Sequence, residues 1–100
     1  MKFIAKTDWD RVHELACEIA NATGQEDSVL TESKTEMLMC VLKELELVYG
    51  PCSKITATTA DYTEEEKRPA IYREALRQAK VEGDVESERL ILESMAEIIR

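Results

Sequence analysis

The chain has 100 residues, of which 44% are apolar and 34% charged, and its 21 acidic and 13 basic residues give a formal net charge of −8. The apolar fraction excludes an intrinsically disordered chain, and no apolar run approaches the roughly 18 residues that a membrane-spanning helix needs. The acidic balance argues against DNA, RNA and anionic lipid as partners, because those surfaces attract positive charge. We therefore expect one globular domain over residues 1–100, with no nucleic-acid partner and no membrane partner.

The N-terminus and the cysteines indicate a reducing compartment. Met1 to Lys6 is too short an apolar stretch for a secretory signal. Cys17, Cys40 and Cys52 are odd in number, so a closed set of disulfides would leave one thiol over. We expect all three cysteines to be reduced and to pack as small apolar side chains in a cytoplasmic protein.

The first predicted helix begins at Thr7 or Asp8, because either side chain can cap a helix N-terminus. Gly24 is expected to end it as the left-handed residue that follows a helix. Between these limits the apolar residues follow the spacing of an amphipathic helix: Val12, Leu15, Ala16, Ile19 and Ala20.

The second predicted helix begins with the capping box Ser33–Glu36, although Leu30 can start it earlier. Gly50-Pro51 ends it, because proline cannot continue a helix. Its apolar stripe is continuous: Leu38, Val41, Leu42, Leu45, Val48 and Tyr49. Further apolar residues, among them Met37 and Leu47, lie outside the stripe, which is typical of a central helix in a bundle or solenoid.

Residues 53–61 fit two kinds of structure. Thr56, Thr58 and Thr59 favour a strand because they are β-branched, whereas Ile55 and Ala60 suit one side of a short helix. No other segment of the chain offers a partner strand, and a lone strand leaves its backbone groups unpaired. We therefore predict a short helix here.

The next predicted helix begins near the capping box Thr63–Glu66, with Pro69 in its first turn, and ends at Gly83. Its buried side is expected to hold Ile71, Tyr72, Ala75, Leu76 and Ala79. Asp84 is expected to cap the last helix. That helix has a broad apolar surface: Leu90, Ile91, Leu92, Met95, Ala96, Ile98 and Ile99.

The two halves of the chain resemble each other. Placing Gly24 on Gly83 pairs apolar or small residues of the two first helices, in the order Val12 with Ile71, His13 with Tyr72, Ala16 with Ala75, and Ala20 with Ala79. A six-residue shortening then pairs the second helices, with Leu38 on Ile91, Leu42 on Met95 and Leu45 on Ile98. Stacked hairpins of this kind would bury a continuous core.

Residues Ile71-Tyr72-Arg73-Glu74-Ala75-Leu76 and Leu92-Glu93-Ser94-Met95-Ala96-Glu97-Ile98 resemble tetratricopeptide-type repeats. In such repeats an aromatic residue precedes Ala-Leu by three positions, and the stretch Ile55 to Tyr62 is similar to a first helix with Ala60 as its small residue. The resemblance covers about half of the chain. It implies a protein- or peptide-binding helical scaffold without catalytic residues.

Together these patterns predict an all-α fold of antiparallel helical hairpins, stacked as a small tetratricopeptide-like bundle or solenoid. Four main helices and a short fifth are expected. The first hairpin spans about residues 8–49, a connector spans about 50–62, and the second hairpin spans about 63–100.

His13 and Cys17 stand four residues apart on the first helix, a spacing that can serve a metal, and His13-Glu14-Leu15-Ala16-Cys17 echoes a zincin motif. A metal site needs further ligands, and Cys40 and Cys52 lack the spacing of a CxxC pair. No nucleophile motif or glycine-rich phosphate loop occurs. We expect a non-enzyme with no cofactor, no metal and no catalytic residue.

Charged faces supply the candidate partner-binding residues. Arg73, Arg77 and Lys80 form a basic stripe on the fourth main helix, the one that ends at Gly83. Acidic faces are expected around Glu36, Glu86, Glu93 and Glu97. Both are also compatible with a solvated surface.

We expect a protein-binding module whose acidic faces meet a basic partner, and a bacterial immunity or antitoxin protein is the sharpest form of that hypothesis. The alternative is a structural or oligomerisation subunit, for instance a homodimer. A small enzyme, with His13 as its best residue, is the third hypothesis.

Overall fold

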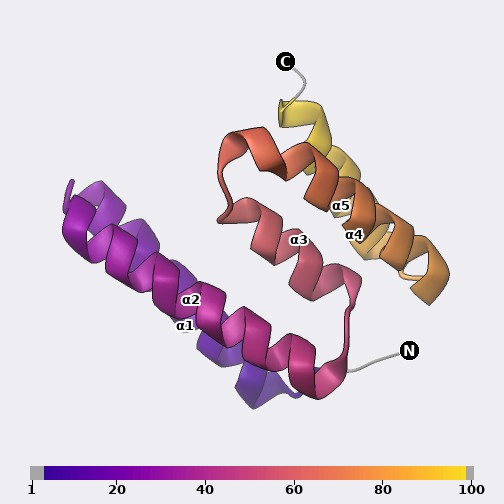
Figure 1. Cartoon of the computed structure of the whole chain (residues 1–100), viewed down its shortest axis with the longest axis horizontal. Coiled ribbons are helices and arrows are strands. Elements are labelled where there is room, and N and C mark those ends of the chain that lie inside the picture. The colour runs from indigo at the N-terminus through magenta and orange to yellow at the C-terminus, as the bar shows by residue number, and fades with distance from the viewer. Residues whose placement is uncertain (1–3, 99–100) are drawn as a thin grey trace. The chain divides into compact units, whose positions relative to one another are not determined.

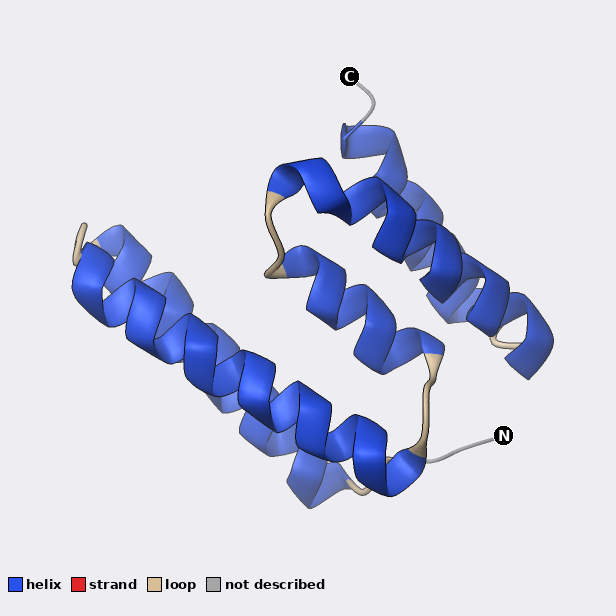
Figure 2. Cartoon of the chain, in the orientation of Figure 1, coloured by secondary structure: helices blue, strands red, loops and turns tan. Residues whose placement is uncertain are grey.

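The structure is a computed structural model that describes residues 4–98, and its regular elements are all helical (Figures 1 and 2). They are α1 (Lys6–Gly24), α2 (Ser28–Tyr49), α3 (Ser53–Asp61), the short 3-10 helix η1 (Glu65–Lys67), α4 (Arg68–Glu82) and α5 (Val85–Ile98). The expected all-α class and the short helix at 53–61 are confirmed. Ile99 of the predicted last helix and residues 1–3 of the predicted N-terminal stretch lie outside the described residues.

The chain divides into two compact units, with the boundary between Val48 and Tyr49. The first unit holds α1 and α2, which run antiparallel. Two ion pairs link them, from Arg11 to Glu44 at 3.6 Å and from Lys34 to Glu18 at 3.3 Å. The early part of each helix is thereby joined to the late part of the other.

Both helices of the first unit bury one side at helical spacing. The buried residues of α1 and α2 are Val12, Leu15, Ile19, Ala22, Leu38, Val41, Leu42 and Leu45. The predicted stripe of α2 is confirmed at four positions but stops before Val48, which is 73% exposed.

The second unit contains α3, η1, α4 and α5, in which α3 packs on α4 and α4 packs on α5 (Figure 1). Its core combines small and large side chains: Ala60, Tyr72, Ala75, Ala79 and Ile91. The three alanines are fully buried, so the backbones of α3 and α4 approach closely, and Tyr72 fills space beside them. The segment that the sequence suggested as a connector is therefore the first helix of this unit.

The predicted alignment of the two halves holds for one helix of each pair and fails for the other. Leu38 and Ile91 are both buried, as the alignment of the second helices requires. His13 is exposed where Tyr72 is buried, and Ala20 is exposed where Ala79 is fully buried. The first helices are therefore not equivalent in that register, since their buried sides are offset by one residue.

Several predicted helix starts are wrong by a few residues. Helix α1 begins at Lys6, so Thr7 and Asp8 lie within its first turn and do not precede it. No side chain caps its N-terminus. Helix α2 begins at Ser28, because the Asp27 carboxylate accepts a hydrogen bond from the Leu30 N–H at 3.0 Å. The expected Ser33–Glu36 box therefore lies inside α2.

Two further end signals differ from expectation. The Thr63 hydroxyl donates to the Thr59 carbonyl oxygen at 2.6 Å, so it extends the end of α3 and does not cap the next helix with Glu66. Gly24 is the last residue of α1, so the predicted end of this helix is confirmed, but the left-handed residue of the turn is Glu26, with φ of 57°. Gly83, with φ of 72°, confirms its predicted place after α4.

Candidate functional site

A polar pocket of about 350 Å³ lies in the second unit, where the end of α3 and the start of α4 meet the end of α5. Three carboxylates, one guanidinium, two hydroxyl groups and one apolar side chain line it: Asp61, Glu65, Glu97, Arg68, Tyr72, Ser94 and Ile98. Ionisable groups from α3, η1, α4 and α5 thus converge on one pocket.

Tyr72 is the centre of the pocket's hydrogen bonds. Its ring is buried in the core, while its hydroxyl donates a short hydrogen bond to the Asp61 carboxylate. Ser94 on α5 lines the pocket with them and lowers the pKa of Tyr72, against the larger effects of burial and Asp61. The packing of α3 and α5 on α4 therefore brings these three polar groups together.

The protonation of the pair Asp61–Tyr72 follows from its surroundings. Partial burial raises the pKa of Asp61, against the effects of the Tyr72 hydrogen bond and the Arg68 charge. Burial and the adjoining Asp61 carboxylate raise the pKa of Tyr72 to about 12. At neutral pH Tyr72 therefore keeps its proton and acts as a hydrogen-bond donor to Asp61.

Arg68 is held in place beside these groups. Its Nε donates to the Thr63 carbonyl oxygen at 2.8 Å, which ties the first turn of α4 to the end of α3. Its guanidinium lies close enough to Asp61 to lower the pKa of that carboxyl. One positive charge thus partly offsets three carboxylates around the pocket.

A second feature of the same unit is the outer strip of α5. Val85, Leu92 and Ala96 recur along one side of the helix, and Val85 and Leu92 are 75% and 49% exposed. Glu88, Arg89 and Glu93 stand beside them and complete a shallow hollow, with Arg89 bound to Glu93 at 3.0 Å. We call these six residues the outer strip.

The four acidic residues singled out from the sequence are all exposed: Glu36, Glu86, Glu93 and Glu97. Glu36 lies in the first unit. On α5, Glu93 belongs to the outer strip, Glu97 lines the polar pocket, and Glu86 belongs to neither.

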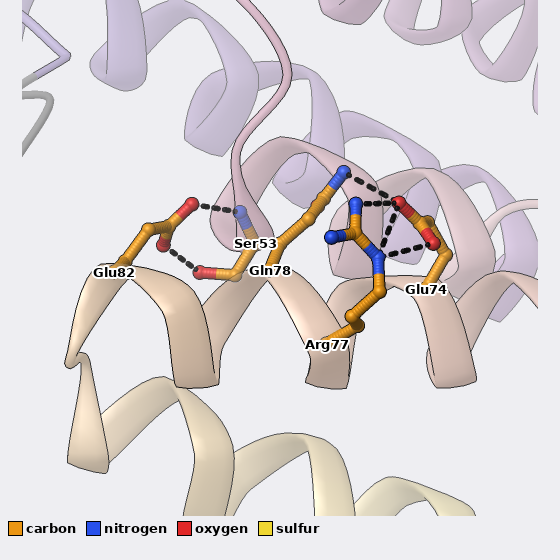
Figure 3. Close-up of polar contacts among 5 residues, drawn as sticks. All are labelled: Ser53, Glu74, Arg77, Gln78 and Glu82. Atoms are coloured by element: carbon orange, nitrogen blue, oxygen red, sulfur yellow. Dashed lines mark hydrogen bonds and ion pairs between the residues drawn. The ribbon is translucent and has the colours of Figure 1, made fainter.

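The predicted basic stripe is present as an exposed side of α4. Arg77 binds Glu74 on its own helix, with Nε and Nη2 to carboxylate oxygens at 2.5–3.2 Å (Figure 3). This pair lowers the pKa of Glu74 and raises that of Arg77. Arg73 and Lys80 are exposed on the same helix. One of the three positive charges of the stripe, that of Arg77, is thus already paired within α4.

The His13–Cys17 pair lies on the exposed side of α1. Within residues 4–98, no three histidine, cysteine or acidic side chains come together as a metal site would require. Cys17 and Cys40 are exposed, which corrects the expectation that they pack in the core, whereas Cys52 is buried as expected. In the same range, no helix is long and apolar enough to cross a bilayer.

No family model, curated protein or solved structure matches this chain. The functional interpretation of the pocket and of the outer strip therefore rests on their geometry alone. Sequence reasoning missed Asp61, Arg68 and Ser94, because they lie at helix ends or on a polar side and follow no motif. Tyr72 was found as a core residue, and its hydroxyl was the one signal of a polar partner nearby.

Proposed function

We propose that this chain is a non-catalytic protein-binding helical module that recognises a basic partner through α5. The observation that supports this proposal is the outer strip, where exposed apolar side chains lie among carboxylates. Exposed apolar residues in a row, bordered by charges, are typical of surfaces that dock a helix. The resemblance to tetratricopeptide repeats points to the same class of function.

The charge on α5 indicates the chemistry of that partner. Helix α5 (Val85–Ile98) carries one basic residue, Arg89, and four acidic residues: Glu86, Glu88, Glu93 and Glu97. Arg89 is already bound to Glu93, so the helix presents a net negative surface. A partner helix with apolar residues flanked by lysine or arginine would fit this surface and would be steered to it by the chain's charge of −8.

The sharpest form of the proposal is an immunity or antitoxin protein that captures a basic enzyme in a one-to-one complex. Small size and acidic charge support this form, because stoichiometric capture needs a stable surface and electrostatic attraction.

A second copy of the chain is the alternative occupant of the outer strip. Apolar side chains such as Leu92 would suit a homodimer, but pairing two copies brings two acidic α5 helices together. Light scattering after size-exclusion chromatography separates the alternatives. A dimer that Leu92→Ser disrupts would replace the basic-partner proposal by an oligomerisation role.

The direct test uses a designed amphipathic peptide of leucine and lysine, with a leucine–glutamate peptide of the same pattern as control. We expect the chain to bind the basic peptide and to lose affinity when salt rises from about 50 to about 500 mM. The acidic peptide should not bind. Binding that is unchanged across this salt range would contradict the proposal.

Two matched variants locate the binding surface. Leu92→Ser removes an apolar side chain from the outer strip, and Leu47→Ser removes one from α2, where Leu47 is 88% exposed. We expect Leu92→Ser to weaken binding of the basic peptide by about fivefold or more, the cost of one lost apolar contact. Leu47→Ser should leave it unchanged, and equal effects of the two variants would show that the outer strip is not the site.

A further inference from the structure

The polar pocket at the end of α5 has a surplus of negative charge. Asp61, Glu65 and Glu97 bring three formal charges and Arg68 brings one of opposite sign, which leaves −2 at neutral pH. Arg68 cannot move freely to neutralise the others, because its Nε is held by the Thr63 carbonyl oxygen. The field inside the pocket therefore favours a cation.

The pocket also has a surplus of hydrogen-bond acceptors. The Tyr72 hydroxyl already donates its hydrogen bond to the Asp61 carboxylate. Glu65 and Glu97 also line the pocket, and their carboxylates form no hydrogen bond or ion pair with the other residues that the structure describes. A ligand with several N–H donors would satisfy these acceptors at once.

The geometry favours an organic cation over a metal ion. Metal ions draw their ligands to within about 2.0–2.6 Å, and no three acidic, histidine or cysteine side chains in residues 4–98 are grouped in that way. A cavity of about 350 Å³ has room for an alkyl chain with a charged end, and Ile98 provides an apolar wall for the chain.

We propose that this polar pocket binds an organic cation with N–H donors, that is, a primary ammonium or a guanidinium group. The carboxylates of Asp61 and Glu97 accept from it, and Ile98 contacts its alkyl part. The group comes either from a free small amine or from a lysine or arginine side chain. The inference goes beyond the proposed function, because Ser94, Glu97 and Ile98 lie on a different side of α5 from Leu92 and Ala96.

The test titrates butylammonium chloride into the ¹⁵N-labelled chain and follows the amide resonances. We expect saturable shifts that centre on Asp61, Tyr72 and Ser94. Tetramethylammonium chloride at the same concentration is the control, because it has the same charge but no N–H donor. No saturable shift with butylammonium, or an equal response to tetramethylammonium, would overturn the proposal.

A pair of variants on α5 ties the binding to the pocket. Glu97→Gln removes a carboxylate of the pocket, and Glu86→Gln removes an exposed carboxylate from the same helix outside it. We expect Glu97→Gln to weaken butylammonium binding about two- to fivefold, as for one exposed ion pair, and Glu86→Gln to have no effect. Equal effects would mean that the cation senses only the overall charge, which also overturns the proposal.

Two peptides identify the source of the cation. One carries a central lysine and the other carries norleucine at that position. If the lysine peptide binds more tightly than butylammonium, the pocket serves the side chain of a protein partner. Equal affinity assigns it to small free amines. Leu92→Ser changes neither result, so failure of the outer strip as a docking surface is distinguishable from failure of this pocket.

Discussion

The Glu82 carboxylate at the end of α4 receives both hydrogen-bond donors of Ser53 at the start of α3. The Ser53 N–H and hydroxyl donate to its two oxygens at 2.9 and 2.6 Å (Figure 3). Ser53 is 1% exposed, so without this carboxylate the first N–H of α3 would be left unpaired in a dry environment. The contact caps α3 from another helix and fixes how α3 lies on α4.

We expect Glu82→Ala to lower the free energy of unfolding by about 1–3 kcal/mol, the cost of leaving a buried donor unpaired. Urea denaturation measures this loss, and hydrogen exchange at the Ser53 amide should accelerate. Glu74→Ala is the matched control on the same helix, because Glu74 binds Arg77 at the exposed surface (Figure 3). If the two variants lose equal stability, Glu82 does not have the capping role described.

Gly83 and Gly24 should respond to alanine with opposite signs. Gly83 has φ of 72°, which alanine adopts at a cost of about 1–2 kcal/mol, whereas Gly24 is the last helical residue of α1. Neither position has an atom within 4 Å of an added Cβ, so only the backbone decides. We expect Gly83→Ala to destabilise the chain and Gly24→Ala to stabilise it by about 0.5–1 kcal/mol. Thermal unfolding of both variants tests this, and destabilisation by Gly24→Ala would contradict it.

Helical periodicity was sufficient to predict the class of this fold and most of its buried side chains. The stripes of α2 and α4 gave Leu38, Leu42, Ala75 and Ala79, because an amphipathic pattern requires one buried side. The short helix α3 followed from the lack of any partner strand.

Helix ends were harder to predict, because a single side chain has several competing hydrogen-bond partners. Thr63 had the spacing of a cap, yet its hydroxyl bonds back to the Thr59 carbonyl oxygen. Asp27, which does cap α2, stands in a polar stretch where several residues could have served. Local sequence alone does not decide between such neighbours.

The polar pocket could not be predicted from the sequence, for a different reason. Asp61 and Tyr72 are eleven residues apart on different helices, and they meet because α3 folds back on α4. No periodic spacing of residues in the sequence indicates that contact. Glu97 was singled out as acidic surface, but its place beside Asp61 depends on how α5 packs.

Asp84 is expected to stabilise α5 as its N-terminal cap. Its carboxylate accepts from the Ser87 N–H at 3.1 Å and from the Ser87 hydroxyl at 2.7 Å. Asp84→Ala should cost about 0.5–2 kcal/mol at neutral pH, as measured by urea denaturation. Asp27→Ala, which removes the cap of α2, is the matched comparison in the other unit.

The contribution of Asp84 should also depend on pH. The hydrogen bonds from Ser87 lower the pKa of Asp84 from its ordinary 3.8. A carboxyl with a lowered folded-state pKa stabilises the fold above its unfolded value and loses that effect as pH falls through the folded value. The stability difference between the wild type and Asp84→Ala should therefore shrink in acid. A difference that grows below pH 3.8 would contradict the assignment.

Tyr72 should titrate later than an ordinary tyrosine, because burial and the Asp61 carboxylate raise its pKa from 10.0 to about 12. The chain has three tyrosines, so the absorbance of tyrosinate is compared between the wild type and Tyr72→Phe. The difference between the two titrations should have its midpoint near 12. Asp61→Asn should lower that midpoint while burial keeps it above 10.0.

The same shift predicts a loss of stability in alkali. A group whose folded-state pKa is raised stabilises the fold fully below its unfolded value and loses that effect as pH rises to the folded value. The wild type should therefore lose stability relative to Tyr72→Phe between pH 10.0 and about 12. Urea denaturation at several pH values checks this, with circular dichroism to show that both chains remain helical. If the two chains lose stability in parallel, the Tyr72 hydroxyl is not coupled to Asp61 in the way that the structure indicates.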